Sequence, residues 1–110
     1  MLTFNLKKRW YEKIKSGEKT IEYREVKDYW TRRIKKLFPD VPDWFDDVCV
    51  GDWIHCSLAQ VECVLRLGYT QKYMLAKINK IAVVDGKDTD LAIDKKVYAI
   101  HLANVREVTE

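Results

Sequence analysis

Three charged residues stand close together in the first quarter of the chain: Lys19, Glu22 and Arg24. Glu22 and Arg24 are two residues apart, so on a β-strand their side chains share one face, with Cβ atoms ~7 Å apart. Lys19 comes just before them, and its flexible side chain could reach back over that face. Together they offer guanidinium donors, a carboxylate acceptor and an ammonium charge. Such a set suits a planar polar ligand with an anionic part, for example a nucleobase attached to phosphate. The alternative is a cross-strand network of ion pairs on a solvated strand.

The elements around these residues are predicted from periodicity. Residues 2–6 alternate apolar and polar, as in a half-buried strand, and the spacing of Leu6, Trp10 and Ile14 then predicts a helical face. Gly17 is a natural helix stop. Residues 20–24 alternate again, with Ile21 and Tyr23 on one face, so the strand is expected to expose Glu22 and Arg24 on the other.

The remaining chain predicts a second helix and about four more strands. The helix carries Trp30, Ile34 and Leu37 on one face, and strands are expected over 53–58 and 61–67. A change of phase near Asn79-Lys80 indicates a β-bulge, and residues 97–105 are apolar on both faces, as in a central strand. The order predicts one domain over residues 1–110: an α+β fold with a mixed, curled sheet or small barrel of about five to six strands and two N-terminal helices.

Charge is unevenly distributed along the chain. Residues 1–36 hold twelve Lys/Arg and five Asp/Glu, a net charge of +7, whereas residues 37–53 hold five aspartates and no base. A basic N-terminal third is what a polyanion-binding face requires. The acidic loop 40–52 either covers and neutralises that face or lies apart from it.

Several classes of protein are not indicated by this composition. No segment approaches the ~20 apolar residues of a membrane span, and no signal peptide is recognisable, which favours a cytoplasmic protein without membrane association. Cys49, Cys56 and Cys63 form no CxxC pair and are expected to be buried thiols. His55 and His101 have no third ligand at metal spacing, so no metal and no cofactor is expected.

The charged segment carries a resemblance to a known family. The pattern Gly17-x-Lys19-x-x-Glu22-x-Arg24, preceded by a helix with Trp10 and followed by Tyr29-Trp30-x-x-Arg33, resembles the signature of the ASCH domain family, whose fold is similar to the PUA-like β-barrels. The likeness extends over nearly the whole chain. It includes Gly51-Asp52 before a strand, Leu67-Gly68-Tyr69 before another, and Val97-Tyr98-Ala99-Ile100 near the end.

The resemblance implies a cleft between the first helices and the barrel, suited to RNA or a nucleotide-like ligand. Some family members resemble amidohydrolases that deacetylate N4-acetylcytidine, and others are similar to ribonucleases. In an enzyme, Lys19 and Glu22 would be the catalytic residues. Lys19 matches the amidohydrolases' catalytic lysine, but Glu22 stands where that branch has a threonine. Residues 83–93 offer Asp85, Asp88 and Asp90 rather than its later glutamate.

Three more residues are candidates for the same ligand. Tyr29 and Arg33, four apart on the second helix, could face the cleft or belong to a plain helix surface. Tyr69 could stack on a base or pack in the core. The sequence thus favours a binding domain for RNA or a nucleotide-like ligand and leaves a hydrolase, or a protein-interaction module with structural ion pairs, as alternatives.

Overall fold

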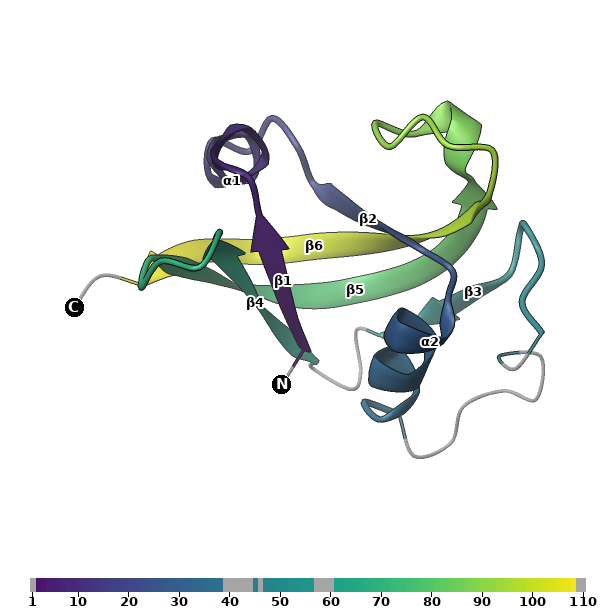
Figure 1. The fold of residues 1–110 in the computed structure, drawn as a ribbon. Helices are drawn as coiled ribbons and strands as arrows, with labels where there is room; N and C mark the ends of the chain where they lie inside the picture. The colour runs from purple at the N-terminus through teal and green to yellow at the C-terminus, as the bar shows by residue number, and fades with distance from the viewer. Residues whose placement is uncertain (1, 39–44, 46, 57–60, 109–110) are drawn as a thin grey trace.

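A computed structural model describes residues 2–38, 45, 47–56 and 61–108 and has an α+β fold. Two helices lie in the N-terminal part, and six strands form one mixed sheet that curls strongly into a half-barrel (Figure 1). The elements in chain order are β1 (Leu2–Leu6), α1 (Lys8–Lys15), β2 (Ile21–Glu25), α2 (Asp28–Lys35), β3 (Trp53–His55), β4 (Glu62–Leu67), β5 (Tyr73–Asp85), the 3-10 turn η3 (Gly86–Asp88) and β6 (Lys96–Val108). The predicted fold class, strand number and helix positions are confirmed.

The sheet has the strand order β1-β4-β5-β6-β2, and β3 also pairs with β5. β1 and β4 are parallel, and every other pair is antiparallel. β6 lies between β5 and β2, which confirms the predicted central strand. Burial on both faces holds for Val97–Ile100, but it does not extend to residue 105, since Asn104 is exposed and Ala103 and Val105 are only partly buried. The expected strand over 53–58 is shorter, since β3 ends at His55; residues 57 and 58 lie outside the described part.

Two irregularities bend the long β5–β6 pair. Ile78 pairs with Leu102 and Lys80 with His101, so Asn79 is an extra residue on β5, at the predicted bulge. A second shift, between Leu75 and Lys77, was not predicted; opposite it on β6, Asn104 has φ +51. Bulges increase local twist and bend the bulged strand. They help these two strands to curve through the whole molecule (Figure 1).

The helices attach to the sheet through a few large side chains. α1 buries Tyr11 and Ile14, while Trp10, expected on the core face, is only partly buried. α2 buries Trp30 and Ile34, as its spacing predicts, but it ends at Lys35, so Leu37 lies beyond the helix and is only partly buried. Part of the Trp10 side chain therefore lies outside the core.

The turn after α1 places Lys19. Gly17 has φ +85, a left-handed conformation that glycine adopts at little cost and that ends helices. The Lys19 amide then donates to the Lys13 carbonyl oxygen at 3.0 Å, which folds the chain back against α1 before β2 begins. The predicted helix, glycine turn and strand are confirmed.

Two expectations about the middle of the chain have different outcomes. Cys56 and Cys63 are buried, but Cys49 is exposed, so the expectation of three buried thiols is wrong. Cys49 lies in a surface turn, where its amide donates to the Asp52 carboxylate at 2.8 Å. Residues 40–44 and 46 of the acidic loop lie outside the described part of the chain. Whether this loop covers a cleft is therefore not tested by the structure. No described helix has the length and apolar character to cross a membrane.

Candidate functional site

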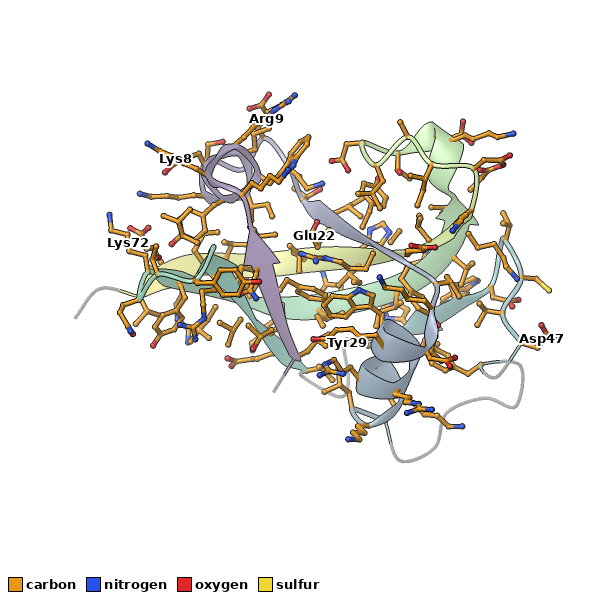
Figure 2. The ribbon with its side chains drawn as sticks, viewed as in Figure 1. Lys8, Arg9, Glu22, Tyr29, Asp47 and Lys72 are labelled. Atoms are coloured by element: carbon orange, nitrogen blue, oxygen red, sulfur yellow. The ribbon has the colours of Figure 1, made fainter. Side chains whose placement is uncertain are left out.

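Glu22 and Arg24 form a hydrogen-bonded ion pair on one face of β2. Arg24 Nη2 donates to Glu22 Oε2 at 3.2 Å, and the Tyr23 amide donates to Glu22 Oε1 at 3.0 Å. In Figure 2, Glu22 lies between β1 and β2, on the inner side of the curled sheet. Both carboxylate oxygens are thus held by donors from β2 itself, which fixes the orientation of the carboxylate.

Glu22 is buried, contrary to the expectation that its strand exposes it. Its side chain is 7% exposed, because the Glu22 face of β2 turns toward the interior of the half-barrel. Burial raises the pKa of the Glu22 carboxyl, and the Arg24 and Lys19 charges counteract that rise only in part. A charged group rarely occupies such a position unless it is paired and hydrogen-bonded, so Glu22 is an unusual core residue.

Arg24 packs against aromatic rings from two other elements. Its guanidinium carbon lies 5.1 Å from the centre of the Phe4 ring and 5.0 Å from that of Trp30. Nη2 also donates to the Asn5 carbonyl oxygen at 3.0 Å. Nε is buried and has no hydrogen-bond partner among the described residues. The guanidinium is therefore fixed in place and retains donor capacity.

Lys19 pairs with Asp90, a residue that the sequence had not singled out as a partner. Lys19 Nζ donates to Asp90 Oδ2, and the lysine side chain is only 9% exposed. The ammonium lies 5.2 Å from the Trp10 ring centre and 4.8 Å from that of Tyr23, within the range of cation–π attraction. In the sequence, the only feature that points to Asp90 is the series Asp85, Asp88 and Asp90 near the end of β5.

A hollow joins these residues. Its cavity volume is about 360 Å³, and its walls come from β1, α1, β2, α2 and residues 90–91. Glu22, Arg24 and Lys19 all line it, together with Trp10 and Trp30. Volumes of ~300–1,000 Å³ are typical of small-molecule sites. Three carboxylates (Glu22, Glu25 and Asp90), four cations (Lys7, Lys19, Arg24 and Lys27) and aromatic side chains thus share one hollow of suitable size.

The other three candidates lie elsewhere. Tyr29 and Arg33 stack on each other, with the guanidinium carbon 3.6 Å from the ring centre, and line a neighbouring hollow with Thr3 and Asn5. Asn5 also lines the hollow of Glu22, so the two are adjacent. Tyr69 follows β4 in a turn, is 94% exposed and lines neither.

The described residues contain no group of three His, Cys, Asp or Glu side chains placed to hold a metal ion. His101 is partly buried on β6, and burial lowers its pKa. The site around Glu22 is built from acid, base and aromatic side chains.

Compared with protein-family models, with curated proteins and with solved structures, the chain matches none of them.

Proposed function

We propose that this protein is a small ASCH-like domain, PUA-like in fold, that binds RNA or a nucleotide-like ligand in the hollow around Lys19, Glu22 and Arg24. The mixed half-barrel with two N-terminal helices is compatible with a PUA-like fold. The observation that carries the proposal is the buried Glu22 carboxylate, which lines a hollow also lined by Arg24, Lys19 and tryptophan rings.

Each group has a partner in a nucleotide. A nucleobase presents N–H donors on its edge, and each Glu22 oxygen, which accepts one protein hydrogen bond, has capacity for a second. The faces of a base stack on aromatic rings, and the aromatic residues Trp10, Tyr23 and Trp30 all line this hollow. The phosphate is an anion for Lys19 and for the donors of Arg24. A base edge, a base face and an anion are thus accommodated together.

The test is a double variant. Lys19→Ala with Arg24→Ala should weaken the binding of mixed-sequence single-stranded RNA and of ribonucleoside 5′-monophosphates at least tenfold. Arg66→Ala with Lys72→Ala is the matched control, because it removes the same charges at the β4–β5 turn, outside the hollow. Tryptophan fluorescence titration reports binding, and circular dichroism reports folding. Equal affinity of the two double variants would refute the proposal.

A hydrolase of the same hollow is the second candidate, and one observation favours it. The Glu22 pKa is raised, and the Lys19 charge acts on Glu22 electrostatically. A carboxyl with a raised pKa beside a cation suits general acid–base chemistry. Incubation with N4-acetylcytidine and with single-stranded RNA tests this. Turnover above that of Lys19→Ala would establish an enzyme, and equal rates would leave a binding domain.

A further inference from the structure

A second hollow lies on the other side of the Lys19–Asp90 ion pair. Its volume is about 460 Å³, and its walls include Arg9 and Lys13 of α1, Thr20 and Ile21 at the start of β2, and residues 88–90. Four residues line both hollows: Trp10, Lys19, Tyr23 and Asp90. The two hollows are therefore adjacent, and a salt bridge flanked by two aromatic rings lies where they meet.

We infer that the two hollows form one groove and that its ligand is a single-stranded nucleic acid of at least two nucleotides, one phosphate of which takes the place of Asp90 at Lys19. This inference rests on the proposed function and extends it from a single nucleotide to a strand. Each hollow alone lies within the ~300–1,000 Å³ of small-molecule sites. A mononucleotide would leave one of them empty.

The second hollow has the features of a stacking subsite. Three cations surround the Trp10 ring: the Arg9 guanidinium at 4.6 Å, the Lys19 ammonium at 5.2 Å and the Lys13 ammonium at 5.5 Å from its centre. Proteins that bind single strands combine an aromatic ring for a base with cations that follow the backbone. Arg9 lies on α1 on the far side of this helix from the core, at the rim of the molecule (Figure 2).

Asp90 occupies the position expected for a phosphate. Its carboxylate pairs with Lys19 Nζ, but the Asp90 side chain is 30% exposed, whereas that of Lys19 is 9% exposed. Asp90 belongs to the segment between η3 and β6, which lies on the same side of the sheet as α1 (Figure 1). The acids Glu18 and Asp88 also line the second hollow, and Glu18 faces Lys13 at 3.9 Å. If a phosphate of the ligand replaces Asp90, the buried Lys19 ammonium still has an anionic partner.

The experiment compares ligands of different length. Tryptophan fluorescence titration would give the Kd of the four ribonucleoside 5′-monophosphates, of mixed-sequence RNA dinucleotides with a 5′-phosphate, and of a mixed-sequence 12-nucleotide RNA. We expect dinucleotides to bind at least tenfold more tightly than monophosphates. Arg9→Ala should remove most of that gain and leave the monophosphates unchanged.

Asp90→Asn tests the ion pair. Without its charge, Asp90 competes less with a phosphate, so dinucleotide affinity should rise about threefold to tenfold. Asp94→Asn is the control, since this aspartate lies in the same segment, is largely exposed and pairs with Lys87. Thermal unfolding verifies that each variant folds; if Asp90→Asn does not, the Arg9→Ala comparison decides.

Three results would overturn the inference in whole or in part. Monophosphates and dinucleotides of equal affinity, with no effect of Arg9→Ala, would refute the two-nucleotide groove and leave the proposed function intact. No binding of any nucleotide or RNA by the unmodified protein would refute both. A weaker dinucleotide complex in folded Asp90→Asn would show that Asp90 holds Lys19 for the ligand and would contradict the exchange of Asp90 for phosphate.

Discussion

Glu22 and Arg24 share one face of β2, where Arg24 Nη2 donates to Glu22 Oε2 at 3.2 Å, yet this pair does not keep the pKa of Glu22 at its ordinary value. Burial opposes the charged form of the carboxyl and outweighs the attraction of Arg24 and Lys19, so the pKa is raised. The pair therefore orients the carboxylate without fully compensating its desolvation.

The first prediction concerns Glu22→Gln and follows from the direction of that pKa shift. An acid with a raised pKa in the folded chain destabilises folding as the pH rises from its unfolded pKa, near 4.5, to its folded pKa. A variant with the neutral glutamine does not lose folding stability in this way as the pH rises. Protonation of Glu22 removes the ion pair with Arg24, just as Glu22→Gln does. The raised pKa of Glu22 is the net result of burial and of this attraction, so the cost of losing the ion pair is already included in it. We expect a melting temperature equal to or higher than that of the unmodified protein at pH 7, with a difference that vanishes near pH 4.

Thermal unfolding by circular dichroism between pH 4 and pH 8 measures this difference. Nucleotide binding should fall about tenfold in the same variant, because a hydrogen bond to a charged acceptor is lost. Glu25→Gln is the control for the melting temperature alone: it lies on the same strand, is more exposed and pairs with Lys95 at 3.1 Å, but it also lines the hollow. Glu62→Gln on β4, outside the hollow, is the control for binding. A melting temperature that falls more at pH 7 than at pH 4 in Glu22→Gln would contradict the assignment.

A second prediction concerns the attachment of α1 to β6. The buried Tyr11 hydroxyl donates to Glu107 Oε2 at 2.9 Å, and burial, followed by this hydrogen bond, raises the pKa of Tyr11 to about 12. Tyr11→Phe should lower the melting temperature at pH 7 by about 4–8 °C, the shift that corresponds to about 1 kcal/mol in a domain of this size.

Alkaline pH gives this prediction a separate readout. Between pH 10 and pH 12 the unfolded chain ionises Tyr11 while the folded chain does not, so the unmodified protein loses stability there and Tyr11→Phe is spared that loss. The two melting curves should therefore converge as the pH rises above 10. A difference that stays constant from pH 7 to pH 11 would show that the hydroxyl is not held as described.

Local patterns were enough to predict the helix–turn–strand that carries Lys19. A 3.6-residue period, a glycine and a period-2 alternation each depend on neighbours in sequence. The same holds for the bulge near Asn79, which appears as a change of phase within one strand. These features need no knowledge of what packs against them.

The burial of Glu22 and the role of Asp90 depend on distant segments and could not be predicted in this way. The alternation of β2 marks Ile21 and Tyr23 as its apolar face, but the half-barrel turns the opposite face inward, toward Phe4 and Trp30. Asp90 is 71 residues from Lys19 and reaches it only because β6 pairs with both β5 and β2. The position of β2 at the edge of the curled sheet determines both the burial of Glu22 and the contact between Lys19 and Asp90.

A third prediction distinguishes the three cysteines. Burial raises the pKa of Cys56 to about 11 and that of Cys63 to about 12, whereas Cys49 is exposed. Since the thiolate is the nucleophile, iodoacetamide at pH 8 should label one thiol of the native protein and three of the denatured chain. Mass spectrometry counts the labels. Cys49→Ser should leave the native protein unlabelled, and rapid modification of a second site would show that a buried thiol is accessible.

The last prediction compares a glycine in the turn that places Lys19 with a glycine in a distant turn. Gly17 and Gly68 have φ of +85 and +54, and a Cβ added at either would meet no atom within 4 Å. Both Gly17→Ala and Gly68→Ala should therefore lose stability through backbone strain alone, about 1 kcal/mol each. Gly17 leads into the Lys19 amide, which donates to the Lys13 carbonyl oxygen, whereas Gly68 follows β4 at a turn outside the groove.

Nucleotide binding should consequently weaken in Gly17→Ala and stay unchanged in Gly68→Ala, although both variants lose stability. Titration with mixed-sequence RNA, together with thermal unfolding, measures both quantities on the same samples. A loss of binding that follows stability equally in the two variants would mean that the groove responds to global unfolding rather than to the position of Lys19. Because both variants strain a glycine with positive φ, a difference in affinity beyond their difference in stability reports the displacement of the lysine from the Trp10 and Tyr23 rings.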